Sequence, residues 1–263
     1  MTTQNKHLNA HGFTLVELAI VITIIGILIG GVLKGQQLIE QARLAATINQ
    51  INNYRSALSI FKTTYNELPG DMIDPDARIV GCSGCKATIN TQGDGLIGNG
   101  DVIMREFNNT SEQTLFWLHL LKADMINGVS DAALTSSGPA IGETHPAAKT
   151  GGLFYAETGS GRNGDAYATG VWGDGGPPQT IGLSIGIRNG LTTTYREWET
   201  YYVISPQSAA QIDRKLDDGK PLSGDVRGLT RNSNYSGCAI NGNNYAEAET
   251  SSAHCTIAAV IGE

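Results

Sequence analysis

Residues 11–43 read HGFTLVELAIVITIIGILIGGVLKGQQLIEQAR, and the apolar run inside this stretch decides the fold. The run from Phe13 to Leu33 contains only three polar side chains, which are Thr14, Glu17 and Thr23. An α-helix rises about 1.5 Å per residue, so about twenty such residues cross a bilayer core of about 30 Å. A helix of a soluble core would carry a polar stripe. We therefore expect this run to span a membrane.

The segment after the apolar run argues against a cleaved secretory signal. Such a signal ends in small residues of an A-x-A pattern, whereas residues 34–40 read KGQQLIE and continue a helix. Lys6 lies on the short N-terminal side, which favours a cytoplasmic N-terminus under the positive-inside rule. We expect one membrane pass, with the remainder of the chain outside the cytoplasm.

Residues 12–17 read GFTLVE directly before the apolar helix. This stretch resembles the processing site of type IV prepilins and type II secretion pseudopilins. The resemblance implies that a prepilin peptidase cuts after Gly12, which makes residues 1–12 a leader and Phe13 an N-methylated mature N-terminus. It also implies the bacterial inner membrane as location, an assembly platform there, and other pilin or pseudopilin subunits as partners.

Glu17 is the carboxylate inside the apolar run. An ionised carboxylate in hydrocarbon costs about 2.5 to 3.5 kcal/mol or more, so it needs a partner. The nearest suitable cation is the new amine of Phe13 on a neighbouring copy, and such pairing would set the stagger of a filament. The alternative is that Glu17 reaches the cytoplasmic headgroups. The two states can follow each other, before and after assembly.

Four glycines lie in the distal half of the run, and they are Gly26, Gly30, Gly31 and Gly35. Their four-residue spacings allow close helix packing in lipid. Each glycine also costs about 1 kcal/mol of helix propensity relative to alanine. The resemblance implies that this part of the helix extends on entering a filament, although glycine is also simply common in membrane helices.

An amphipathic pattern follows the apolar run. Apolar residues recur every three or four positions at Leu44, Ile48, Ile51, Tyr54, Leu58, Phe61 and Tyr65. Leu68, Pro69 and Gly70 should end this helix. We thus expect four segments, which are the leader 1–12, the membrane half of the helix 13–33, its amphipathic half 34–68, and a globular head 69–263.

The head is expected to have an α+β fold. Strands are expected at 152–157, 179–187, 191–198 and 201–204, and helices at 111–125 and 208–216. The pilin-like resemblance implies the long N-terminal helix packed on an antiparallel sheet. Residues 65–72 (YNELPGDM) and 209–226 (AAQIDRKLDDGKPLSGDV) are also similar to segments of pilin-like bacterial proteins. The net charge of −7 argues against nucleic acid as a partner.

The chain has four cysteines, Cys82, Cys85, Cys238 and Cys255, which allow three pairings. Outside the cytoplasm disulfides are expected, and we favour Cys82 with Cys85 and Cys238 with Cys255. The second pair resembles the C-terminal disulfide loop of type IV pilins. A four-cysteine zinc site is the rival interpretation, but only Cys82 and Cys85 have ligand spacing. A redox CxxC would need a thioredoxin-like βαβ pattern, which is missing.

Residues 93–106 read GDGLIGNGDVIMRE. Four oxygen donors among flexible glycines have the composition of a calcium site, and they are Asp94, Asn99, Asp101 and Glu106. Calcium binding by some type II secretion pseudopilins supports this interpretation by resemblance. The spacing is not that of an EF-hand, and a solvated turn is the alternative.

Residues 182–186 match G-x-S-x-G around Ser184, and His254 follows. A nucleophile elbow needs a helix directly after the serine, whereas residues 187–194 have turn and strand chemistry. We therefore expect a structural subunit that forms or primes a type IV pilus or type II secretion pseudopilus, and no enzyme. The size of the head favours a minor pilin or pseudopilin. A filament-borne adhesion module and a membrane-anchored serine hydrolase are the alternatives.

Overall fold

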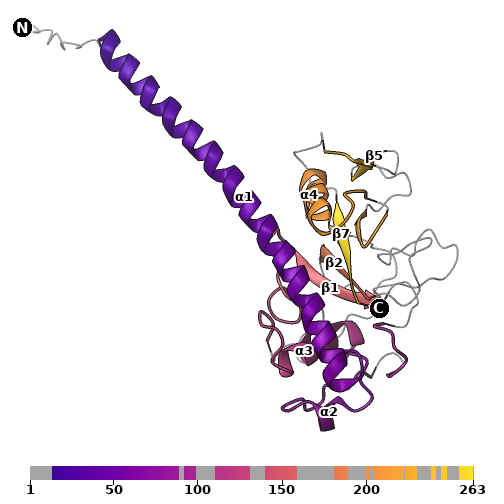
Figure 1. The fold of residues 1–263 in the computed structure, drawn as a ribbon. Helices are drawn as coiled ribbons and strands as arrows, with labels where there is room; N and C mark the ends of the chain where they lie inside the picture. The colour runs from indigo at the N-terminus through magenta and orange to yellow at the C-terminus, as the bar shows by residue number, and fades with distance from the viewer. Residues whose placement is uncertain are drawn as a thin grey trace, which may run out of the picture. The chain divides into compact units, whose positions relative to one another are not determined.

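The computed structural model divides the chain into two compact units, Met1–Ala42 and Arg43–Glu263. The structure describes the residues in the ranges 14–88, 92–98, 110–130, 140–158, 181–188, 200–201, 204–221, 223–229, 238–240, 244–247 and 255–262. Its first helix is followed by an antiparallel sheet and shorter helices (Figure 1). The expected α+β class with a long N-terminal helix is confirmed.

Helix α1 runs unbroken from Leu15 to Tyr65. It ends at Asn66, whose φ of 55° is the left-handed conformation that commonly follows a helix. Leu68, Pro69 and Gly70 come directly afterwards, as expected from the sequence. The helix therefore belongs to both units: its first part lies in the N-terminal unit, and the part from Arg43 onward lies in the second.

The sheet of the second unit is antiparallel. Its strand order is β1-β2-β7-β4, and β3 pairs with the far end of β2. The strands of this sheet are β1 (Leu153–Thr158), β2 (Ile181–Arg188), β3 (Thr200–Tyr201), β4 (Val226–Leu229) and β7 (Thr256–Gly262). A separate two-stranded ladder joins β5 (Ala239–Ile240) to β6 (Asn244–Tyr245).

Two expected strands, 152–157 and 179–187, match β1 and β2 closely within the described residues. Of the expected strand 201–204, Tyr201 belongs to β3 and Ile204 forms an isolated bridge to Cys255. The expected strand 191–198 lies outside the described residues. Strand β7 was not predicted, because its near-continuous apolar run TIAAVIG lacks the alternation of a strand with one solvent-exposed face.

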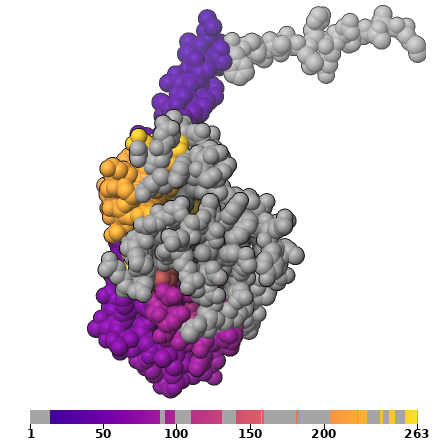
Figure 2. All heavy atoms as spheres, turned by 90° about the vertical axis from the view of Figure 1, so that its right-hand side faces the viewer, coloured from indigo at the N-terminus to yellow at the C-terminus, as the bar shows by residue number. Residues whose placement is uncertain are grey.

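Three shorter helices complete the second unit, and they are α2 (Pro75–Arg78), α3 (Glu112–Lys122) and α4 (Pro206–Leu216). Helix α3 lies within the expected 111–125. Helix α4 begins two residues before the expected Ser208, because Ser205 is its N-cap and accepts a hydrogen bond from the Ser208 N–H at 3.1 Å. Helices α2 and α4 lie at opposite ends of this unit (Figures 1 and 2).

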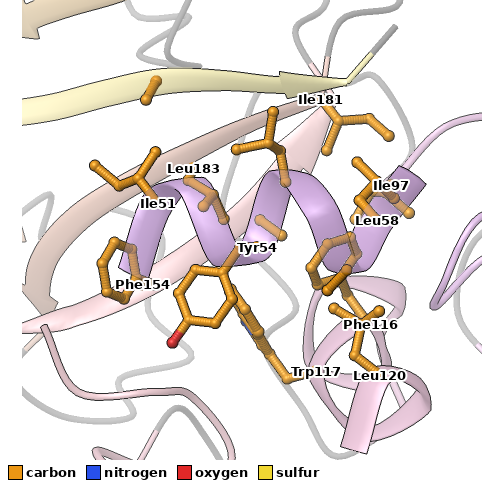
Figure 3. Close-up of a cluster of buried hydrophobic side chains, with 14 of the residues drawn as sticks. Ile51, Tyr54, Leu58, Ile97, Phe116, Trp117, Leu120, Phe154, Ile181 and Leu183 are labelled. Atoms are coloured by element: carbon orange, nitrogen blue, oxygen red, sulfur yellow. The ribbon is translucent and has the colours of Figure 1, made fainter. Parts of the chain in front are cut away.

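The core of the second unit forms around the C-terminal half of α1. The side chains of Ile51, Tyr54 and Leu58 lie between sheet residues and α3 (Figure 3). Tyr54 meets Trp117 of α3 and Phe154 of β1 edge-on, with ring centroids 5.0 and 5.1 Å apart. The apolar stripe expected from the sequence is therefore the buried face of this helix, with Ile48 and Tyr65 at its partly buried edge.

Candidate assembly site

The N-terminal unit presents an apolar surface. Between Leu15 and Leu33 the large hydrophobic side chains are 45% to 87% exposed. In the described part of the chain, α1 is the one helix long and apolar enough to cross a membrane, by length and composition. An exposed apolar surface of this extent marks a membrane or interaction site. This helix fits a single-pass inner-membrane anchor.

Glu17 and Thr14 form a capping box at the start of α1. One carboxylate oxygen of Glu17 accepts hydrogen bonds from the backbone N–H and the hydroxyl of Thr14, each at 2.9 Å. In return, Thr14 Oγ1 accepts from the Glu17 N–H at 3.2 Å. The T-x-x-E pattern of Thr14 and Glu17 predicts this reciprocal arrangement, although the expectations above did not include it. The same Glu17 carboxylate therefore caps its own helix.

Gly12 and Phe13, the expected processing site, lie outside the described residues. Gly26, Gly30, Gly31 and Gly35 all lie inside α1 without interrupting it. A methyl group added at any of these four would meet nothing within 4 Å. The helix surface at these glycines is thus sterically open to a neighbouring helix. Extension of this part of the helix on assembly stays a prediction.

The structure pairs Cys82 with Cys85 and Cys238 with Cys255, which is the pairing that we favour from the sequence. Asp76 organises the first disulfide loop, because its carboxylate accepts from the Gly84 and Cys85 N–H groups at 3.1 and 3.0 Å. With their sulfurs bonded to each other, these cysteines offer no thiolates for the zinc site considered above.

Of the expected calcium donors, Asp94 is described, while Asn99, Asp101 and Glu106 lie outside the described residues. Asp94 Oδ1 accepts from the Leu96 N–H at 2.9 Å, which is a local turn. The N–H groups of residues 93, 94 and 95 all donate to the carboxylate of Asp71, which is 2% exposed. These successive N–H groups form an anion-binding nest, and Asp71 fills it.

The YNELPGDM segment connects the end of α1 to the rest of the head. Glu67 forms an ion pair with Arg78, and Gly70 N–H donates to His119 Nδ1 at 2.9 Å. A Cβ at Gly70, whose φ is +89°, would collide with the Glu112 carbonyl oxygen. These contacts give the segment a structural role, which the sequence pattern alone did not indicate.

Residues 213–220 (DRKLDDGK) contact the C-terminal disulfide loop. The Tyr245 hydroxyl in this loop donates to Asp213 of α4 at 2.7 Å, and the Gly219 N–H donates to the other oxygen of Asp213 at 2.9 Å. Burial raises the pKa of Asp213 to about 6. Asp217 and Asp218 lie close to Asp213; Asp218 accepts a hydrogen bond from the Lys220 N–H, and Asp217 accepts one from the Val226 N–H at the start of β4.

Ser184 of the G-x-S-x-G pattern lies inside β2, where its backbone is level with Tyr155 of β1 and Ala258 of β7. The strand continues to Arg188. A nucleophile elbow is a sharp strand-to-helix turn, so this serine does not occupy one. His254 lies outside the described residues. The pattern is that of a sheet strand.

Comparison with known proteins gives one family match. Residues 8–33 match the model of the prokaryotic N-terminal methylation motif. No curated protein and no solved structure gives a significant match to the chain. The methylation motif, and the long N-terminal helix followed by an antiparallel sheet, agree with the type IV pilin and pseudopilin family and support a pilin-type precursor.

Proposed function

We propose that the chain is cleaved after Gly12 by a prepilin peptidase, methylated at Phe13, and then assembled into or used to prime a filament. The filament is a type IV pilus or a type II secretion pseudopilus. The observation that carries this proposal is Glu17, a carboxylate on a helix whose other side chains from Leu15 to Leu33 are almost all apolar and exposed. The methylation motif at residues 8–33 supports it.

The capping box indicates how Glu17 is stabilised before assembly. Two hydrogen bonds from Thr14 satisfy one carboxylate oxygen, but they do not neutralise its charge. A charge at the edge of hydrocarbon gains from a cation, and the free amine of Phe13 on another copy supplies one. Glu17 thus has a helix-capping role within its own chain and an ion-pairing role between chains.

Two variants separate these roles. Glu17→Gln removes the charge but retains a side chain that serves a capping box. Thr14→Val keeps the charge and removes the hydroxyl that takes part in the box. We expect both variants to be inserted and processed. We expect Glu17→Gln to be absent from sheared filaments and Thr14→Val to be present in them.

The measurement has two parts. Mass spectrometry of the membrane-bound protein should find methylated Phe13 as the first residue, and an intact Met1 would contradict processing. Immunoblots of sheared filaments then report incorporation. Normal incorporation of Glu17→Gln would refute the ion-pairing role. Loss of both variants alike would show that incorporation needs the capping box of Thr14 as well as the charge of Glu17.

The large head favours a minor pilin or pseudopilin over a major subunit. We also propose that the four oxygen donors from Asp94 to Glu106 bind calcium. The nest filled by Asp71 shows how the first part of that loop is held by the chain's own carboxylate.

A further inference from the structure

Two charged side chains lie on α1 between Glu17 and Arg43, and they are Lys34 and Glu40. Both are exposed. They follow directly after the apolar stretch that ends at Leu33. The Lys34 ammonium donates to Gln37 Oε1 of the same helix at 3.3 Å. Lys34 and Glu40 give this part of the helix one positive and one negative position.

Their spacing prevents Lys34 and Glu40 from pairing with each other within one helix. Residues that pair on a helix surface are three or four apart, whereas Lys34 and Glu40 are separated by six. Six residues correspond to about 9 Å along the axis and a turn of about 120° around it. A single copy therefore presents its positive and its negative group in two different directions.

We propose that, in the filament proposed above, Lys34 of one copy pairs with Glu40 of the next copy. The partner is thus a second copy of this chain, shifted by about 9 Å along the helix axis. A contact that joins different patches on two copies is heterologous, and it propagates without closing. Each copy then engages one neighbour through Lys34 and another through Glu40.

The expected pair of Phe13 and Glu17 has the same polarity. In each pair the positive group precedes the negative group, by four residues in the first and by six in the second. These separations correspond to about 6 Å and about 9 Å along the helix. Both pairs thus require the copy that supplies the cation to be displaced in the same direction.

The location of the pair between helices of neighbouring copies strengthens its effect. Exposed ion pairs in water contribute little, because solvent and salt screen them. Between packed helices, where water is partly excluded, a charge pair is less screened. A lysine at the end of an apolar span also reaches headgroups as a simple anchor. If Lys34 acted only as an anchor, substitution of Glu40 would not affect assembly, whereas the proposed pair requires both residues.

Charge reversal in the full chain distinguishes the pair from an anchor. We expect Lys34→Glu and Glu40→Lys each to lower incorporation into sheared filaments about tenfold, because like charges then face each other. The double variant Lys34→Glu/Glu40→Lys should restore incorporation. Lys86→Glu, at an exposed head position, is the control and should leave it unchanged. Failure of the double variant to restore incorporation would overturn the pair.

Cysteine cross-linking measures the register directly. All four native cysteines are in disulfides, so new ones react separately. Copies with Lys34→Cys and copies with Glu40→Cys, expressed together and oxidised in filaments, should form a heterodimer. Gln37→Cys and Arg43→Cys in place of Glu40→Cys are the controls, about 4.5 Å to either side along the helix. Stronger cross-linking of a control than of Glu40→Cys would overturn the proposed register.

The inference rests on the proposed function, but the two fail differently. A wild-type chain that is processed yet never enters filaments contradicts both. A wild-type chain that enters filaments in a Glu17-dependent way, while the charge swap fails to restore the reversed variants, contradicts the Lys34–Glu40 pair alone.

Discussion

His119 Nδ1 accepts a hydrogen bond from the Gly70 N–H, and His119 Nε2 lies 2.9 Å from the Cys85 carbonyl oxygen. Since Nδ1 is the acceptor, the proton of the neutral ring is on Nε2 and is donated to Cys85. The ring is fully buried. One imidazole on α3 thus connects the segment after α1 to the first disulfide loop.

Acid should weaken the fold through His119. Burial lowers the pKa of His119 to about 4. Between pH 6.5 and 4 the unfolded chain binds a proton at this position that the folded chain does not, so stability is complete above pH 6.5 and falls as the pH falls. The folding stability lost through protonation of His119 is about 3 kcal/mol at most.

The measurement compares wild type with His119→Gln, whose amide can accept from Gly70 and donate to Cys85 without titrating. Melting curves of the two proteins between pH 7 and 4 should show wild type losing stability relative to His119→Gln as the pH falls. A difference that is independent of pH would contradict this role of His119.

Asp71 should act in the opposite sense. Burial raises the pKa of Asp71 to about 6, so the folded chain binds a proton more tightly than the unfolded chain. Its contribution therefore falls as the pH rises from about 4 to about 6. Asp71→Ala leaves the N–H groups of residues 93–95 without an acceptor and should cost about 2 to 4 kcal/mol.

Asp71→Asn keeps an acceptor oxygen and should cost less than the alanine variant, with the pH dependence between 4 and 6 removed. Thermal melting at pH 5 and pH 7.5 measures both effects. A cost of less than about 0.5 kcal/mol for Asp71→Ala would show that the side chain does not hold the loop.

The two disulfides should contribute unequally. The Cys238–Cys255 bond closes a loop with a sequence separation of 17, and the Cys82–Cys85 bond one with a separation of 3. In the chain-entropy model these are worth about 3 and about 2 kcal/mol. Serine replacement of each pair, followed by denaturant titration, tests the order, which an equal or reversed loss would contradict.

The buried face of α1 should be sensitive to truncation and its exposed face insensitive. Leu58 is 1% exposed and Ile60 is 55% exposed. We expect Leu58→Ala to cost about 2 to 5 kcal/mol because it leaves a cavity in the core. Ile60→Ala is the matched control and should change stability by less than about 0.5 kcal/mol. Denaturant titration in detergent measures both.

Calcium binding is predicted for the loop that contains Asp94. Titration calorimetry with calcium chloride should detect binding, and bound calcium should raise the melting temperature by mass action. Asp101→Asn and Glu106→Gln should weaken it, with Glu143→Gln as an exposed control. A flat titration with unchanged melting would remove calcium from the proposal.

The sequence was sufficient to predict the elements in which apolar residues recur at a regular spacing. The apolar run and the stripe from Leu44 to Tyr65 predicted α1, because helical periodicity is a local property. Strand β7 was missed because it is buried on both faces in the sheet, which depends on residues far away in the chain. The start of α4 was misplaced because the Ser205 cap was not recognised.

The candidate site was predictable to a similar degree. Glu17 was evident from its apolar surroundings, and its partner Thr14 was readable from the T-x-x-E pattern but overlooked. The contact between Asp71 and residues 93–95 joins positions more than twenty residues apart. A lone aspartate in a sequence gives no sign of such a partner.

The position of β7 determines when the sheet can be completed. Strand β7 follows every other element of the sheet in chain order, yet it lies between β2 and β4. Among the described strands, β4 pairs with β7 alone, whereas β2 also pairs with β1 and β3. The sheet can therefore be completed only after residues 256–262 have been synthesised, so the last step of its folding is post-translational.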